Sequence, residues 1–347
     1  MWKYVLKRIL LALVTTFIIL SITFLLMQLL PFQKPVGTTD AQFGYYSKQV
    51  YLGYVYDYST AHPELGAPLW TYLDGSNQWH YFYEVPAFTQ YFTWLKNIIT
   101  RWDWGTSVYI APNLSAITII GQRLPVSMAL NIISTLIAVP LGIIFGIIAA
   151  LKKNKPTDHL ISTLVMVLIS IPSFILIVFL MYFLCYKISW LPSQWPSSSA
   201  PIGQRVLGYF IPVLSLSLGS IAGYCRFTRA ELCEVMESDY LLLARTKGLT
   251  KRQAIIRHAL RNAMVPIVPS ILAEFLSIMS GSMILENLYG IPGIGSLFIK
   301  AVNVNQPDYN VLFVDMAIFT TFGLMAGVLL DISYGFIDPR IRMGAKK

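Results

Sequence analysis

Long apolar runs restrict this chain more than any other feature of its sequence. A helix needs roughly 20 consecutive apolar residues to cross a bilayer core about 30 Å thick. Runs of about this length cover residues 9–30, 124–151, 160–186, 206–225, 264–285 and 311–330. They predict an all-α membrane protein with six transmembrane helices.

The composition favours a membrane protein over a soluble one. Hydrophobic residues make up 55% of the 347 residues and charged residues only 12%, which is too little polar surface to cover a soluble globule of this size. The N-terminus resembles a signal peptide, with Lys3, Lys7 and Arg8 before the first run. That run is too long for a signal peptide and no small-residue cleavage site follows, so we expect residues 1–30 to form the first transmembrane helix.

The positions of lysine and arginine predict the orientation. If the N-terminus is cytoplasmic, 18 of the 26 basic residues fall in cytoplasmic segments, and several of the others lie in one long outer segment that the positive-inside rule does not count. We therefore expect both termini in the cytoplasm. The net charge of +9 follows from this topology, and no basic patch with interleaved aromatic residues indicates a nucleic-acid partner.

Motifs for chemistry are missing from the sequence. Cys185, Cys225 and Cys233 lie in or beside the apolar runs without metal-ligand spacing, so we expect small apolar filler with no disulfide and no metal. The chain contains no nucleotide-binding loop with its lysine, no zinc-protease motif and no nucleophile elbow. We expect no catalytic site and no cofactor.

Residues 31–121 form a segment too long for a loop without structure of its own. The segment is rich in tyrosine and tryptophan and has little charge. We expect a small folded extracellular cap, followed by a five-helix core over residues 122–347. Two interpretations of the aromatic residues stay open: they rest at the lipid headgroup level around a small core, or they form a docking face for an extracellular partner.

The longest cytoplasmic stretch, residues 226–262, is predicted to form two short helices. Ser238 or Asp239 can cap the first, and Gly248 supplies the left-handed residue that ends it. Thr250 opens the second, with Gln253 completing a capping box. The stretch carries more apolar surface than a solvated loop leaves exposed, so a partner should cover part of it. Its apolar residues are Leu241, Leu242, Leu243, Leu249, Ile255 and Ile256.

The same stretch resembles the cytoplasmic loop of binding-protein-dependent ABC importer permeases. The resemblance rests on Ala244, Gly248 and the sequence His-Ala-Leu-Arg-Asn that begins at His258. Leu242 and Leu243 stand where the general family motif has Glu and Ala, but the surrounding residues resemble the peptide-importer branch. Further landmarks are Trp-Asp-Trp-Gly-Thr-Ser at 102–107, Gly281, Ser282 and Glu286 before Pro-Gly-Ile-Gly at 292–295, Asp-Ile-Ser-Tyr at 331–334 and Asp-Pro-Arg-Ile-Arg at 338–342.

The resemblance implies a multi-pass transport subunit of the cytoplasmic membrane of a bacterial cell, one that catalyses no reaction itself. Its implied partners are a second homologous permease, two cytoplasmic ATPase subunits, an extracellular substrate-binding lipoprotein, membrane lipid and a peptide substrate. ATP-driven closure of the ATPases would move the loop as a lever. The residues implied in this coupling are Ala244, Arg245, Lys247, Gly248, Leu249, Arg257, His258 and Arg261.

Two carboxylates lie within the apolar runs. A charge inside a bilayer costs a few kcal/mol and usually faces a water-filled path or a polar partner. For Glu274, a place in the translocation path and a hydrogen bond between helices are both open; Asp315 is expected to be solvated near the outer surface.

Alternatives to oligopeptide import also remain. Permeases for dipeptides or nickel chelates are similar, and an ion-coupled secondary transporter is a further alternative, although the chain shows no clear internal repeat. A receptor that docks a binding lipoprotein without ATPases is another.

Overall fold

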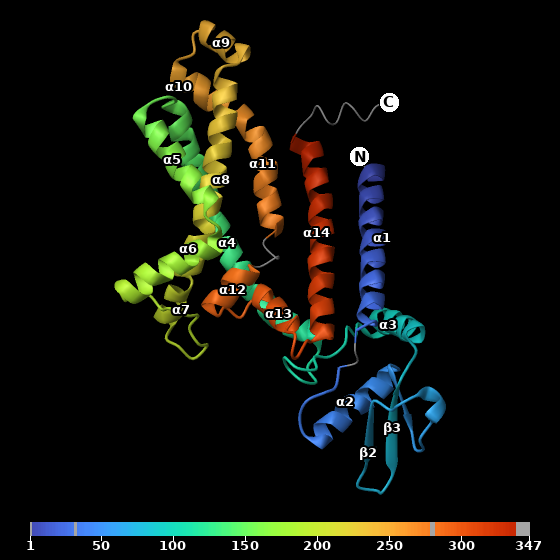
Figure 1. The fold of residues 1–347 in the computed structure, drawn as a ribbon. Coiled ribbons are helices and arrows are strands. Elements are labelled where there is room, and N and C mark those ends of the chain that lie inside the picture. The colour runs from blue at the N-terminus through green and yellow to red at the C-terminus, as the bar shows by residue number, and fades with distance from the viewer. Residues whose placement is uncertain (1, 31–32, 278–281, 338–347) are drawn as a thin grey trace. The chain divides into compact units, whose positions relative to one another are not determined.

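The computed structural model describes residues 2–30, 33–277 and 282–337 and is mostly helical (Figure 1). The chain divides into two compact units. The cap unit consists of Leu10–Arg123 and Leu297–Thr321, and the core unit consists of Met1–Ile9, Leu124–Ser296 and Phe322–Lys347.

The cap unit contains a three-stranded antiparallel sheet. Its strands are β1 (Val55–Tyr58), β2 (Trp70–Leu73) and β3 (Trp79–Glu84), with β3 in the centre. A 3-10 turn, η1 (Pro63–Leu65), lies between β1 and β2. The sheet is flanked in sequence by α2 (Thr39–Leu52) and α3 (Ala87–Arg101).

Aromatic side chains form the core of the cap unit. Tyr46 is 1% exposed and stacks on Phe82 and Trp70, with ring centroids 4.9 and 5.2 Å apart. Tyr45, Val55 and Val108 complete the buried cluster. Part of the aromatic content of residues 31–121 therefore serves as a hydrophobic core.

The remaining elements are helical. In chain order they are α1 (Trp2–Met27), α4 (Ala116–Leu151), α5 (Pro156–Ser170), α6 (Ser173–Leu180), the π-helix η2 (Met181–Lys187), α7 (Ile202–Gly208), α8 (Phe210–Met236), α9 (Asp239–Thr246), α10 (Lys251–Ala254), the π-helix η3 (Ile255–Ala259), α11 (Leu260–Ser277), α12 (Met283–Tyr289), α13 (Ile294–Ala301) and α14 (Tyr309–Ile337).

Four helices of the described residues are long and apolar enough to cross a membrane: Val5–Met27, Ala116–Leu151, Ile202–Met236 and Tyr309–Ser333. A fifth crossing is reached if α5 and the helix of α6 and η2, which are bent by 100°, form one span. The run at 264–285 is divided between α11 and α12, with residues 278–281 outside the described part. Six crossings therefore remain a prediction.

The apolar run at 160–186 contains Pro172, which predicts a kink or an interruption, and the structure has an interruption there. The helix breaks at Ile171, whose φ of −97° and ψ of 116° are extended. Pro172 causes the break, because a proline lacks the N–H of the helix ladder and disfavours helical backbone in the residue before it. Ser215 of α8 donates a 2.7 Å hydrogen bond to the carbonyl of Ser173 just after the break.

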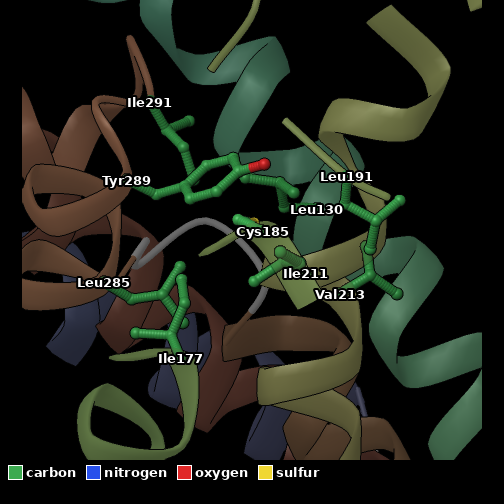
Figure 2. Packing of buried hydrophobic residues seen from close by; sticks show 9 residues of the cluster. All are labelled: Leu130, Ile177, Cys185, Leu191, Ile211, Val213, Leu285, Tyr289 and Ile291. Carbon is green, nitrogen blue, oxygen red and sulfur yellow. The ribbon is translucent and has the colours of Figure 1, made fainter. Parts of the chain in front are cut away.

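Buried apolar residues of the core unit gather around Tyr289 (Figure 2). Its hydroxyl donates to the carbonyl of Pro192 at 2.7 Å, and Cys185 lies in the same cluster as apolar filler. The cluster joins α4, α6, α8 and α12, with members Leu130, Ile177, Cys185, Leu191, Ile211, Val213, Leu285, Tyr289 and Ile291.

The glycines of α4 permit close packing, as their i, i+4 spacing predicts. A Cβ on Gly142 would lie 2.5 Å from the Cβ of Tyr224, and one on Gly146 would lie 2.6 Å from the Cβ of Thr228. Both contacts are with α8. The equivalent pair in α14, Gly323 and Gly327, has no described atom within 4 Å of an added Cβ.

Candidate functional site

The segment at 226–262 begins with α9. Its first turn closes on the carbonyl of Ser238, which accepts from the backbone N–H groups of Leu241 and Leu242 at 3.1 and 3.4 Å. The helix ends before Gly248, whose φ is +96°. The glycine therefore has the positive φ that the sequence predicts, which other residues adopt only with strain.

The capping box at Thr250 is confirmed. The backbone N–H of Thr250 donates to Oε1 of Gln253 at 3.1 Å, and that of Gln253 donates to the Thr250 hydroxyl at 3.3 Å. The helix that follows is longer than predicted, because the π-turn η3 carries it from α10 into α11 without a break. The second arm of the segment is thus the start of α11.

The apolar residues of the segment divide between two faces. Leu241 and Ile255 are 5% and 9% exposed, and Leu241 packs with Ala150 and Leu232. Leu249 is partly buried against the same cluster. The outward set, which we call the apolar loop face, consists of Leu242, Leu243 and Ile256, at 61%, 56% and 55% exposed.

Exposed basic residues belong to the same segment as the apolar loop face. Lys247, Arg257, His258 and Arg261 are exposed, and Ala244 is half-buried. Arg245 belongs to α9, but its side chain lies outside the described residues. A small apolar surface with exposed charged residues beside it is suited to contact with a protein partner.

An ion pair connects α5 to α8. Arg229 donates through Nε and Nη2 to the two oxygens of Asp158 at 2.6 and 2.8 Å. Asp158 is 1% exposed and also accepts from the backbone of Asn154 at 2.9 Å. In the sequence, Arg229 was counted only among the basic residues that indicate the orientation. The carboxylate of Asp158, in the first turn of α5, was the feature that could have indicated an ion pair.

A second ion pair joins Lys153, in the connection between α4 and α5, to Glu237 at the end of α8. The hydrogen bond to Glu237 raises the pKa of Lys153. Both ion pairs therefore hold the α4–α5 connection against α8, directly before the start of α9.

Glu274 makes a hydrogen bond between helices. Ser220 of α8 donates to its Oε1 at 2.8 Å, and one turn further along α8 the hydroxyl of Tyr224 donates to the carbonyl of Ser270 at 3.2 Å. The hydrogen bond between helices, one of the two open interpretations of Glu274, is therefore observed. Asp315 is 0% exposed, so the expectation that it is solvated is wrong: it lies on the buried face of α14 that also carries Val311 and Val314.

Comparison with known families shows what this arrangement belongs to. The family described as "Binding-protein-dependent transport system inner membrane component" matches residues 142–343. The chain belongs to this family. It is accordingly a permease of the cytoplasmic membrane that crosses the bilayer more than once, and a transport component rather than an enzyme.

Similar permeases match it over their whole length. The dipeptide transport system permease protein DppB of Lactococcus lactis is 31% identical, and the oligopeptide transport system permease protein OppB of Escherichia coli is 32% identical. Each comparison covers 99% of this chain and 100% of the relative.

Two solved structures share the fold. An amino acid ABC transporter aligns with a TM-score of 0.50 and 18% identity over 63% of this chain and 94% of its own. The MetNI methionine ABC transporter, in inward-facing conformations, aligns with 0.51 and 14% over 64% and 97%. At these identities the likeness concerns the fold alone.

Two of the motifs that resemble the family make buried hydrogen bonds between separate segments of the permease. The first contains Glu286. Glu286 is 1% exposed and accepts from Ser127 Oγ at 2.7 Å, from Ser282 N at 3.2 Å and from Ser296 N at 3.0 Å. Gly293 lies so close that an added Cβ would be 2.4 Å from Glu286 Oε2. This carboxylate therefore joins α4, α12 and α13 within the core unit.

Asp308 has the same role in the cap unit. One carboxylate oxygen accepts from the hydroxyl of Ser107 at 2.6 Å and from the backbone N–H groups of Val108, Tyr109 and Ile110 at 3.0–3.1 Å. The side-chain amide of Asn310 donates to the carbonyl of Thr106 at 2.8 Å. The end of the 102–107 landmark is thereby attached to the start of α14. The motif at 338–342 and Gly281 lie outside the described residues.

Proposed function

We propose that this permease is a transmembrane subunit of an ATP-driven importer of oligopeptides and forms half of its translocation path. The proposal is supported by relatives named for dipeptide and oligopeptide transport, which match the whole chain at 30–32% identity. Dipeptides and nickel chelates are the alternative substrates.

The apolar loop face is the observation that carries the coupling to ATPases. Leu242, Leu243 and Ile256 are more than half exposed, next to exposed basic residues. The segment is stiffened by the capping box at Thr250 and Gln253, so a push on this face would be transmitted along α11 rather than absorbed in a loop. We assign Gly248 to the turn, Ala244 to close packing, and Arg245, Lys247, Arg257 and Arg261 to polar contacts with an ATPase; Leu249 and His258 complete the coupling segment.

In this proposal the chain crosses the membrane six times with both termini in the cytoplasm. Residues 31–121 are then an extracellular cap, and residues 122–347 form the core with its coupling loop at 226–262. The distribution of lysine and arginine supports this orientation. A second permease completes the path, two ATPases drive it and an extracellular lipoprotein delivers the peptide, while Glu274 is the candidate for a path-lining residue.

Uptake of a radiolabelled oligopeptide by cells with and without this gene tests the proposal. Partner genes are present in both strains, and a nickel chelate is measured in parallel. We expect peptide uptake to be lost without the gene and restored by it, and to depend on ATP rather than on an ion gradient. Unchanged peptide uptake with loss of nickel uptake would contradict the peptide assignment.

A further inference from the structure

We propose that α3 is an interfacial helix, embedded in the headgroup and acyl boundary of the membrane leaflet on the cap side. The proposal does not depend on the transported substrate, because it rests only on α1 crossing the membrane. Both helices belong to the cap unit over the residues used below.

The polarity of α3 is the reverse of that expected for a helix on a water-soluble surface. Its buried face carries the amides Gln90 and Asn97, at 6% and 4% exposed, together with Trp94. Gln90 donates to the carbonyl of Val85 at 2.7 Å, and Asn97 donates to that of Leu52 at 2.9 Å. These two amides thus face inward, where their hydrogen bonds are satisfied.

The opposite face of α3 is apolar and uncovered. Phe88, Phe92 and Ile99 are 71%, 54% and 74% exposed, and Trp102 at the C-cap is 65% exposed. With the half-buried Leu95 they follow the spacing i, i+4, i+7, i+11 and i+14, which places them along one side of a helix. Four large apolar side chains in a single row do not remain in water without a partner.

Contacts with α1 place this row at membrane depth. Tyr91 hydrogen-bonds Ser21 of α1 at 3.0 Å, and Trp94 stacks on Phe24 with ring centroids 4.7 Å apart. Figure 1 shows α3 lying across this end of α1. The membrane-crossing helix ends at Met27, so at 1.5 Å per residue these contacts lie about 4–9 Å inside its end. Interfacial helices bury their apolar face to about this depth, roughly 5–10 Å.

The flanking residues fit the headgroup region. Lys96 is exposed at the edge of the apolar row, where its long side chain can reach phosphate groups. Arg101 lies over the ring of Tyr51 at 4.8 Å, and Trp102 follows it. Aromatic and basic residues at this level are typical of membrane interfaces.

Spin labelling of the full chain in phosphatidylcholine and phosphatidylglycerol vesicles tests the inference. Nitroxides are attached to Phe92→Cys and Ile99→Cys, with Thr100→Cys and Trp79→Cys as exposed controls off the apolar row. Cys185, Cys225 and Cys233 are buried, so the unmodified chain supplies the labelling background. Accessibility to oxygen, which concentrates in lipid, is compared with accessibility to a water-soluble nickel complex.

We expect oxygen to dominate at positions 92 and 99 and the nickel complex to dominate at positions 100 and 79. Nickel access at all four positions would overturn the inference, because α3 would then face water. Exclusion of both reagents at 92 and 99 in the assembled transporter would also overturn it, because a protein subunit would then cover the row. Labels at these sites replace exposed side chains, and thermal unfolding of each variant verifies that it is folded.

Discussion

Single buried carboxylates decide much of the local structure of this permease. Glu286 and Asp308 each accept three or more hydrogen bonds, at least one of them from a segment far away in the sequence, and both are nearly or fully buried. A buried donor that loses its acceptor costs about 1–3 kcal/mol, so such residues act far beyond their own size.

Replacing Glu286 should test this directly. Glu286→Ala removes the acceptor of Ser127, Ser282 and Ser296, and we expect a loss of about 2–4 kcal/mol of stability. Thermal unfolding in detergent measures the effect. Glu286→Gln keeps the size and an acceptor oxygen and should cost clearly less; equal effects of the two variants would argue against the hydrogen bonds as the cause.

Two glycines should respond differently to alanine. Gly293→Ala places a Cβ 2.4 Å from Glu286 Oε2 and Ser127 Oγ, so we expect a lower melting temperature. Gly248→Ala meets nothing within 4 Å and carries only the strain of a positive φ, about 1–2 kcal/mol. If Gly248→Ala destabilised the permease more than Gly293→Ala, the packing argument would be wrong.

Gly248→Arg should instead abolish transport while membrane insertion stays normal.

At the scale of elements, the permease depends on contacts of α8 with its neighbours. Arg229 holds the first turn of α5 through Asp158, and the break at Pro172 leaves α6 free to turn away from α5. Helix α8 is followed in the chain by α9, which carries Leu242 and Leu243 of the apolar loop face. Substitutions in α5, α8 and α9 can therefore distinguish residues that stabilise the permease from residues proposed to bind the ATPase.

The Asp158 and Arg229 pair should be strongly coupled. Removing one partner leaves the other charge without its bidentate contact, and we expect Asp158→Ala or Arg229→Ala to cost about 2–3 kcal/mol. The double variant should cost much less than the sum. A double-mutant cycle by thermal unfolding measures the coupling, and additive effects would show that the pair contributes nothing.

Neighbouring leucines of α9 provide a matched comparison. Leu241→Ala empties a buried site and should cost about 2–3 kcal/mol of stability. Leu243→Glu changes an exposed residue and should leave the free energy of unfolding within about 0.5 kcal/mol of the original value while abolishing binding of the ATPase subunit. Co-purification of the ATPase with each variant is the measurement. Normal co-purification of Leu243→Glu would contradict the assignment of the apolar loop face.

At the scale of the whole molecule, the proposed orientation places α9 and the cap sheet on opposite sides of the membrane. A cysteine at Leu243 should be labelled by a membrane-impermeant maleimide only in inside-out vesicles, and one at Trp79 only in intact cells. Both residues are exposed in the chain, at 56% and 47%. Labelling of both from the same side would overturn the six-helix orientation.

The sequence by itself determined what depends on neighbouring residues. Apolar runs indicated the membrane helices, lysine and arginine indicated an orientation, and Gly248, Thr250 and Gln253 indicated how the segment at 226–262 turns. Each of these signals depends on residue types along the chain and not on which segments meet in space, so they can be read from the sequence. The bend at Pro172 was only partly foreseen: proline indicates an interruption, but not its angle.

Only the tertiary structure decided which side of each element is covered. Ser127 and Glu286 are 159 positions apart, and no local pattern pairs them. Likewise, Leu241 and Leu243 are the same residue type two positions apart, yet one is buried and the other exposed. The burial of Asp315 and the reversed polarity of α3 follow from their neighbours in space, because burial depends on what packs against a residue rather than on its identity.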